Sequence, residues 1–291
     1  LWLCYGAVHS PYQPAPRHRN ELAGVDIETP KDIFGPRPGK PDWAQKINEW
    51  EKDALGRPVG GKKSLNEWVR LYHQGVIALD EAAARLMTVL EETGQRENTL
   101  VLFTSDQGLA FGQHGFRGNK VAPYDANIRS PLIFSMPGRI PMGKVCEVPV
   151  SGPDLVSTMF RFAGIREPWE MHGRDLSPLL KDPNARWPHP AMMVSTGHTF
   201  GSNTRVTPAG DAYQRGVPWY VLLRDKQYKY IRPLVPEREE LYDIRRDPEE
   251  LDNLAIKPDY QTVLARMRSA MLSELRRTKA PFLNTMPQPK V

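Results

Sequence analysis

Residues 64–108, SLNEWVRLYHQGVIALDEAAARLMTVLEETGQRENTLVLFTSDQG, contain a helical pattern followed directly by a strand pattern. Ser64 and Glu67 have the spacing of a capping box, in which a hydroxyl and a carboxylate satisfy the first free amides of a helix. Gly94 is placed to end that helix as a left-handed cap. Between these two signals, apolar residues recur with helical periodicity over about seven turns. They are Leu65, Trp68, Tyr72, Val76, Leu79, Ala83, Leu86 and Leu90.

The strand pattern after this helix indicates the fold class. Residues 99–104 (TLVLFT) are a continuous apolar run, typical of a strand buried on both faces of a parallel sheet. Residues 1–5 (LWLCY) and 131–135 (PLIFS) are two more such runs, and residues 151–163 predict a second helix that begins at Ser151. Helices alternating with buried strands predict an α/β fold, with a mostly parallel sheet sandwiched by helices.

Two other regions differ from this α/β part in composition and in predicted secondary structure. Residues 14–63 are rich in proline, glycine and charge, and predict a long surface excursion with one helix around residues 42–50. The C-terminal region predicts short strands at 191–195, 220–223, 228–232 and 241–243, and a last amphipathic helix at 258–278. We therefore divide the chain into an α/β part at residues 1–186 and a small α+β subdomain, an antiparallel sheet plus a helix, at residues 187–291.

Composition excludes several classes of protein. The chain has 291 residues, of which 40% are hydrophobic and 25% charged, as in an ordinary globular protein. Its net charge of +5 is scattered along the sequence, which argues against nucleic-acid binding but suits an anionic substrate. No stretch approaches the roughly 20 apolar residues of a membrane span. Cys4 and Cys146 form neither a zinc motif nor a disulfide framework, and Cys4 is predicted to be a small core residue.

An adjacent carboxylate and amide follow the run at residues 99–104. In open α/β sheets, ligands bind beyond the carboxyl ends of the strands. Asp106 and Gln107 stand at such an end, and both supply the oxygen donors that a hard cation such as Ca²⁺ prefers. The alternative is that Asp106 only caps the next turn.

Three other polar residues lie in loops after predicted strands. Lys120 offers a positive charge for a phosphate or sulfate oxygen, and the alternative is a solvated surface lysine. His9 is placed to donate a proton to a leaving group. His114 lies between two glycines in the same loop as Lys120. For both histidines the alternative is an ordinary loop residue.

Five segments, taken in order, resemble the sulfatases of the alkaline phosphatase superfamily, and the likeness covers most of the chain. Each segment is weak evidence alone, but five in the same order are specific. Residues 7–11 (AVHSP) are similar to a strand-end histidine motif, 80–94 to the long helix and 97–108 to the metal-binding strand of the family. Residues 111–133 resemble its lysine loop and next strand, and 228–254 resemble its C-terminal subdomain.

The resemblance implies a role for each matching residue. Asp106 and Gln107 would be Ca²⁺ ligands, although the second ligand is commonly Asn or His in such enzymes. Lys120 would contact the sulfate and the ester oxygen, and His9 would bind sulfate and protonate the leaving alcohol. His114 would be part of the substrate-binding pocket, shaping it rather than doing chemistry. The substrate would be a sulfated carbohydrate or a small aryl sulfate, in a periplasmic, secreted or lysosomal enzyme.

The sequence also departs from the family pattern. Sulfatases carry a Cys or Ser in a Cys/Ser-x-Pro-x-Arg motif that is oxidised to formylglycine, the nucleophile, and they carry an upstream pair of metal-binding aspartates. Neither cysteine of this chain begins such a motif, and we expect no copy of it here. We therefore expect residues 1–186 to be the C-terminal part of a catalytic domain whose nucleophile lies upstream of Leu1, and we expect this chain alone to be inactive.

Two other functions stay open at this stage. A phosphodiester or phosphonate monoester hydrolase of the same superfamily would share the pocket. A non-catalytic anion- or glycan-binding remnant would keep the fold without turnover. Substrate specificity is expected to lie in residues 14–63 and around His198.

Overall fold

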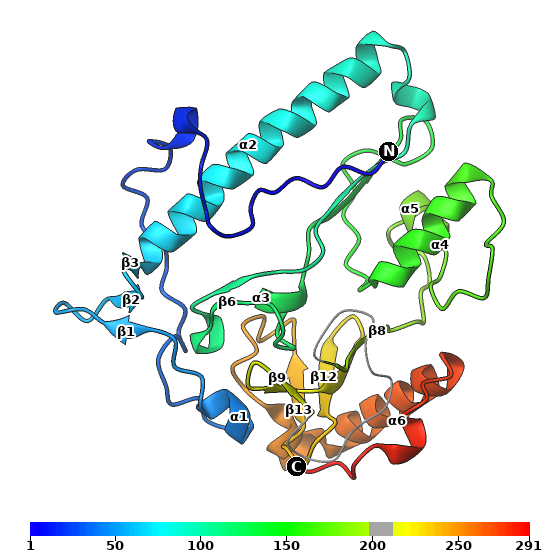
Figure 1. Ribbon diagram of the computed structural model, residues 1–291. Coiled ribbons are helices and arrows are strands. Elements are labelled where there is room, and N and C mark those ends of the chain that lie inside the picture. The colour runs from blue at the N-terminus through cyan, green and yellow to red at the C-terminus, as the bar shows by residue number, and fades with distance from the viewer. Residues whose placement is uncertain (198–211) are drawn as a thin grey trace.

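The computed structural model describes residues 1–197 and 212–291 and has a mixed α/β architecture (Figure 1). Its longest element is the helix α2 (Leu65–Glu92), which extends away from the C-terminal sheet. The Ser64 hydroxyl accepts a hydrogen bond from the Glu67 amide at 3.2 Å, which provides the N-cap. Gly94, with φ of 66°, follows the C-cap Thr93. The helix predicted from these end signals is confirmed.

The strand after this helix pairs differently from the prediction. β4 (Val101–Thr104) pairs with β7 (Leu132–Ser135) in an antiparallel register, with Thr104 opposite Leu132. Every pairing between the named strands of the described residues is antiparallel, so the prediction of a mostly parallel sheet is wrong for this part of the chain, although the mixed α/β class is confirmed. The reason is the connection. Residues 105–131 return as a long loop rather than as a crossover helix, so β7 runs back against β4.

Residues 1–5 do not form the expected strand. Leu1 and Trp2 are fully exposed or nearly so, and Cys4 is exposed rather than buried in a core. An apolar run shows only that a segment is suited to burial, because a strand forms only where another strand supplies its hydrogen bonds. Phe103 and Ile133, which face each other on β4 and β7, are also 41% and 57% exposed. The described residues therefore leave apolar side chains of this strand pair uncovered.

The proline-rich excursion is anchored by a small core of its own. It contains α1 (Asp42–Gln45) and three short antiparallel strands, β1 (Glu51–Lys52), β2 (Pro58–Gly60) and β3 (Lys63–Ser64). The helix expected around residues 42–50 is thus a single turn. Trp50 is 1% exposed, and its indole Nε1 donates a hydrogen bond to the Phe116 carbonyl at 2.8 Å. Around it pack Ile33, Leu65, Val69 and Phe111, which join the excursion to α2 and to the loop after β4.

Besides one 3-10 turn (Gln113–Gly115), the loop between β4 and β7 contains three short elements. They are β5 (Ala110–Phe111), its antiparallel partner β6 (Arg117–Asn119) and α3 (Asp125–Ile128). Beyond β7, α4 (Gly152–Ala163) begins at Ser151 as predicted, with a capping box to Asp154, and α5 (Ser177–Lys181) packs near it.

The C-terminal region forms a four-stranded antiparallel sheet in the order β13-β12-β11-β8. Its strands are β8 (Ala191–Ser195), β11 (Tyr220–Arg224), β12 (Tyr228–Pro233) and β13 (Glu240–Asp243), and the pair β9 (Tyr213–Gln214) and β10 (Val217–Pro218) lies beside it. The helix α6 (Gln261–Arg277) lies along the sheet (Figure 1). The predicted small C-terminal unit of sheet and helix is confirmed.

The two faces of this sheet pack against different partners. Leu223 and Tyr230 face a core that contains Leu264 and Met267 of α6. On the other face, Tyr220 and Ile231 pack in a cluster with Phe116 and other residues of the loop after β4. The C-terminal sheet therefore supports the loop that carries Lys120. The boundary at residue 186 remains a prediction.

Candidate functional site

The end of β4 presents one carboxylate oxygen that has no partner in the described structure. Ser105 donates its hydroxyl to Asp106 Oδ1 at 3.2 Å and to the Gln107 carbonyl at 3.0 Å. The Gln107 amide also donates to Asp106 Oδ1, at 3.0 Å. These bonds fix the carboxylate through Oδ1. Among the described residues, Oδ2 receives no hydrogen bond.

The neighbouring Gln107 has a complementary feature. Its side-chain Nε2 is buried without a hydrogen-bond partner in the described structure. The nitrogen and oxygen of a side-chain amide occupy nearly equivalent positions, so rotation of the amide by 180° would place the oxygen there instead. Two oxygen donors fit part of a Ca²⁺ coordination shell, which takes 6–8 oxygens in all. Groups of three or more His, Cys, Asp or Glu side chains that could hold a metal ion are absent from residues 1–197 and 212–291.

Lys120 lies in a tightly held loop. Gly118, two residues before it, has φ of 75°, and the buried Asn119 accepts backbone hydrogen bonds from Val121 and Ala122 at 2.7 and 3.1 Å. Asn127 donates to the Asn119 carbonyl at 2.8 Å. The ammonium group of Lys120 itself makes no ion pair with another described residue.

His9 is exposed and lies in the turn after residues 1–5. Its Nδ1 is 2.7 Å from the Ser10 carbonyl oxygen, which fixes Nδ1 as the protonated nitrogen of the neutral ring. The Nε2 atom then remains for a ligand. When the ring is protonated, Nε2 carries the proton that a leaving group needs.

Packing contacts bring the backbone segments that carry these residues next to one another. A Cβ on Gly108 would lie 2.6 Å from the Ala126 carbonyl, so the end of β4 packs directly on α3, the helix that holds Asn127. A Cβ on Gly118 would lie 3.8 Å from the hydroxyl of Tyr12, three residues beyond His9. The aromatic rings of Tyr12 and Tyr72 are 6.1 Å apart.

The helix α2 forms the back of this meeting point. A Cβ on Gly75 would lie 3.0 Å from Val8 Cγ1, so the residue before His9 packs on the helix one turn from Tyr72. The Tyr72 ring lies 5.4 Å from that of Phe111, three residues beyond Gly108, so this part of α2 packs on the loop after β4. Burial, and then the Asp106 carboxylate, raise the pKa of the Tyr72 phenol. The segments around His9, Asp106 and Lys120 thus meet at one face of α2, although the role of each side chain remains a prediction.

His114 is enclosed rather than open to a ligand. It is 2% exposed, its Nδ1 is 2.7 Å from Asp32 Oδ2, and its backbone amide donates to Asp32 Oδ1 at 2.9 Å. Burial, and then the positive charge of Lys40, lower the pKa of His114 to about 3 against the opposing effect of Asp32. The imidazole is therefore neutral near pH 7 and ties the excursion to the Lys120 loop. A substrate-binding role for His114 remains a prediction.

A buried charge network fixes the far side of the Lys120 loop. Lys229 is fully buried, with its ammonium group 2.9 Å from Asp125 Oδ1 and 2.6 Å from Glu250 Oε1. The Tyr124 hydroxyl donates to Glu240 at 2.9 Å, and the Tyr220 hydroxyl donates to the Val121 carbonyl at 2.9 Å. The Lys229–Asp125, Tyr124–Glu240 and Tyr220–Val121 contacts each join residues about 100 or more apart in sequence, and no local pattern predicts them.

One stretch of the chain does match the Cys/Ser-x-Pro-x-Arg pattern of the nucleophile motif. The expectation that this pattern does not occur in the sequence is therefore wrong. Ser135, Pro137 and Arg139 match Cys/Ser-x-Pro-x-Arg. Ser135 is the last residue of β7 and pairs with Val101, at the opposite end of the strand pair from Asp106. The separation is roughly 15 Å at the usual rise per residue. The Ser135 hydroxyl also accepts a hydrogen bond from Arg96, so this match does not place a nucleophile near Asp106.

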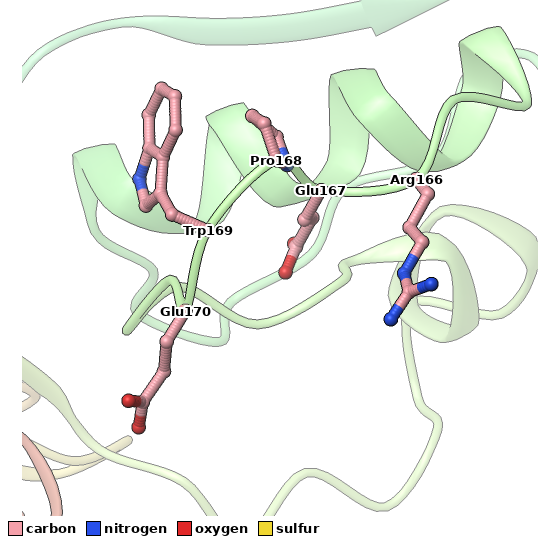
Figure 2. Close-up of a pocket in the computed structure, with 5 residues that line it drawn as sticks. All are labelled: Arg166, Glu167, Pro168, Trp169 and Glu170. Atoms are coloured by element: carbon pink, nitrogen blue, oxygen red, sulfur yellow. The ribbon is translucent and has the colours of Figure 1, made fainter.

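Two surface hollows lie away from these residues. Residues 166–170, in the loop after α4, line one of them, and Figure 2 shows the side chains of Trp169, Glu167 and Arg166 around it. Glu170 in the same loop is paired with Lys279 at 2.6 Å. The other hollow lies between residues 187–190 and α6. Neither hollow is lined by a predicted site residue.

Comparison with known proteins identifies the family. A family model described as "Sulfatase" matches residues 1–165, and one described as "N-sulphoglucosamine sulphohydrolase, C-terminal" matches residues 112–278. The chain belongs to the sulfatase family. It is 28% identical to an N-acetylglucosamine-6-O-sulfatase of Bacteroides thetaiotaomicron, covering 85% of this chain and 42% of that protein. It is also 28% identical to an arylsulfatase of Clostridium perfringens, covering 92% and 51%.

Solved structures support the same fold for this sulfatase chain. A structure in complex with its substrate D-glucosamine-2-N,6-O-disulfate matches with a TM-score of 0.74 at 22% identity, covering 94% of this chain and 64% of that one. A phosphonate monoester hydrolase from Silicibacter pomeroyi matches with a TM-score of 0.61 at 25% identity, covering 73% and 42%. The sulfatase chain spans about half the length of the curated relatives named above. In residues 1–197 and 212–291, every helix is too short or too polar to cross a membrane.

Proposed function

We propose that the protein containing this chain hydrolyses sulfate esters with the help of Ca²⁺. The observation that carries the proposal is the packing, next to α2, of the three segments that contain Asp106, Lys120 and His9. Membership of the sulfatase family supports it independently.

The oxygen-donor pair would hold the metal ion. Asp106 would use its free Oδ2, and Gln107 its side-chain oxygen after rotation of the amide. When bound, Ca²⁺ neutralises part of the negative charge of the sulfate group. The hydrogen bonds at Asp106 Oδ1 keep the carboxylate oriented, so little reorganisation is needed on binding.

Lys120 would stabilise negative charge, and His9 would donate a proton to the leaving group. The Lys120 ammonium group binds a sulfate oxygen and stabilises negative charge as it develops on the ester oxygen. His9, protonated with Nδ1 on the Ser10 carbonyl, gives its Nε2 proton to that oxygen as the bond to sulfur breaks. These two roles require both groups on the leaving-group side of the sulfur atom.

The nucleophile would come from polypeptide outside residues 1–291. The family resemblance implies formylglycine, together with two further metal-binding aspartates. Two observations support a contribution from elsewhere: the exposed apolar residues Phe103 and Ile133 on β4 and β7, and the greater length of the relatives. Large exposed apolar patches mark surfaces that another element covers.

The substrate would be a sulfated carbohydrate, with a small aryl sulfate as the simpler case. Relatives named for sulfated sugars, including an ulvan-active sulfatase of Formosa agariphila, support this class. Specificity is proposed to come from residues 14–63; His198, the other predicted region, lies outside the described residues. The names of relatives include extracellular sulfatases, which supports an exported protein, whether secreted, periplasmic or lysosomal.

The test is sulfate release by the full-length protein encoded by the reading frame of this chain. Lys120→Ala and His9→Ala should each lower kcat/KM by about 100-fold or more, the usual scale for acid-base and charge-stabilising groups. Lys144→Ala and His172→Ala, at exposed positions outside the site, are matched controls that should keep wild-type rates. Wild-type rates in both site variants would defeat the assigned roles.

A second function is favoured by the similarity to phosphonate monoester hydrolases. Parallel assays with matched sulfate, phosphodiester and phosphonate monoester substrates separate the two. A kcat/KM higher for the phosphorus esters would favour the second function. Binding of sulfated sugar by the full-length protein without turnover of any ester would instead favour a non-catalytic glycan-binding protein.

A further inference from the structure

The loop around Lys120 is closed by a single side chain. Asn119 is 7% exposed, and its Oδ1 accepts the backbone amides of Val121 at 2.7 Å and Ala122 at 3.1 Å. The acceptor, Asn119, precedes Lys120 in the chain and the donors, Val121 and Ala122, follow it. The backbone of Lys120 therefore lies within the hydrogen-bonded turn. Such side-chain turns fix the backbone as a main-chain turn does.

The same turn is tied to the rest of the site. Asn127, with no exposed surface, donates from Nδ2 to the Asn119 carbonyl at 2.8 Å and to its Oδ1 at 3.4 Å. Asn127 belongs to α3, on which Gly108 and therefore the end of β4 pack. The Asn119 turn thus relates the position of Lys120 to that of Asp106.

The Lys120 side chain has no competing partner. In the described part of the chain its ammonium group has no hydrogen bond or ion pair, so the loop backbone is what determines where the charge lies. A flexible four-carbon side chain can bind an anion weakly from many backbone positions, but it can stabilise a transition state only from a narrow range.

We propose that Asn119 is a positioning residue that acts through Lys120, and this inference rests on the proposed sulfatase function. Its amide oxygen, and not its nitrogen, performs the role, because the oxygen accepts both backbone bonds. Aspartate keeps a carboxylate oxygen at that place, whereas alanine removes it.

The test is a double-mutant cycle in the full-length protein with an aryl sulfate substrate. Asn119→Ala should lower kcat/KM by about 10- to 100-fold, since a misplacement of about 1 Å costs on that order. Asn119→Asp should recover most of the loss. In the Lys120→Ala background, Asn119→Ala should have less than a ~2-fold further effect, because coupled residues are not additive.

The chain offers a matched control. Asn253 is 1% exposed, and its Oδ1 also accepts two backbone amides, those of Leu241 and Ala255, each at 3.0 Å. Asn253→Ala removes a side-chain oxygen that likewise accepts two backbone amides but lies away from Lys120, and one of its donors, Leu241, is 12 residues away in sequence. Any loss of activity it causes should be the same size with and without Lys120→Ala.

Amide hydrogen exchange supplies a readout that does not need turnover. Val121 and Ala122 should exchange faster in Asn119→Ala and at the wild-type rate in Asn119→Asp. Three results would overturn the inference: an active Asn119→Ala, a loss of equal size in both Lys120 backgrounds, or no change in exchange at these two amides. A wild-type protein that releases no sulfate would instead refute the proposed function itself, and with it this role.

Discussion

Substitution of Gly108 by alanine tests the contact that joins the predicted metal ligands to the Lys120 loop. The new Cβ would lie 2.6 Å from the Ala126 carbonyl oxygen and 3.0 Å from that of Arg129, whereas ordinary contacts begin at 3.4 Å. Both neighbours are backbone atoms, which cannot rotate away, so the end of β4 and α3 must move apart by several tenths of an ångström. Overpacking of this kind costs about 1–3 kcal/mol, which for a chain of this size lowers Tm by about 2–12 °C.

The effect on activity should exceed the effect on stability. The movement separates Asp106 and Gln107 from the loop that holds Lys120, and a displacement approaching 1 Å lowers kcat/KM by up to about 100-fold. The assay is sulfate release by the full-length protein at saturating Ca²⁺ and at a temperature well below both Tm values, beside thermal unfolding of the same samples.

Gly152→Ala and Gly75→Ala are the controls. Gly152, the first residue of α4, has no atom within 4 Å of its Cβ position, so alanine should change the free energy of unfolding by less than about 0.5 kcal/mol. At Gly75 the contact is Val8 Cγ1 at 3.0 Å, a side-chain atom that can move, and alanine gains helix propensity. If Gly108→Ala were as stable and as active as Gly152→Ala, the end of β4 would not pack on α3, and the meeting of the segments would be wrong.

Three other perturbations give distinct results. The pKa of His114 is lowered to about 3 in the folded protein. Below about pH 6.5 the unfolded chain therefore binds a proton at this histidine that the folded chain does not bind. Lowering the pH from 7 to 5 should decrease the free energy of unfolding by about 2 kcal/mol through this group. Urea unfolding of His114→Gln should show a correspondingly smaller loss over that range, while the exposed His172→Gln should behave as wild type; an unchanged pH dependence in His114→Gln would contradict the buried neutral ring. Trp50→Ala should lower the free energy of unfolding by about 3–5 kcal/mol, because it leaves a cavity in the core of the excursion and removes the hydrogen bond to the Phe116 carbonyl. A decrease below about 1 kcal/mol in urea unfolding would mean that Trp50 does not anchor the excursion. Chelation should abolish sulfate release by the full-length protein and Ca²⁺ should restore it, with Asp106→Ala needing far more Ca²⁺ for half-maximal rate; equal Ca²⁺ requirements would exclude Asp106 as a ligand.

Local signals in the sequence predicted individual elements well. The helix over residues 65–92 follows from its cap, its apolar periodicity and its terminal glycine, all of which act within a few residues. The four strands and the helix of the C-terminal unit also appear where expected. These elements are determined by short-range hydrogen bonding and by which side chains can face a core.

Partners of the strands and loops could not be predicted from the same signals. The apolar runs at 1–5, 99–104 and 131–135 predict burial but not which strand pairs with which, so the direction of β4 against β7 was missed. The family resemblance predicted Lys120 and Asp106 as site residues, but nothing local pointed to the bonds of Asn119 to the Lys120 loop or of Asp32 to His114. The Asp32–His114 contact spans 82 residues, and only the folded chain brings such residues together.

An experimental structure of the full-length protein with Ca²⁺ and a bound sulfate or sulfated sugar tests the central claim most directly. The Asp106 and Gln107 oxygens are expected about 2.3–2.6 Å from the cation, and Lys120 Nζ and His9 Nε2 within about 3.2 Å of oxygens on the same anion. A cation bound away from the end of β4, or an anion that either Lys120 or His9 cannot reach, would contradict it.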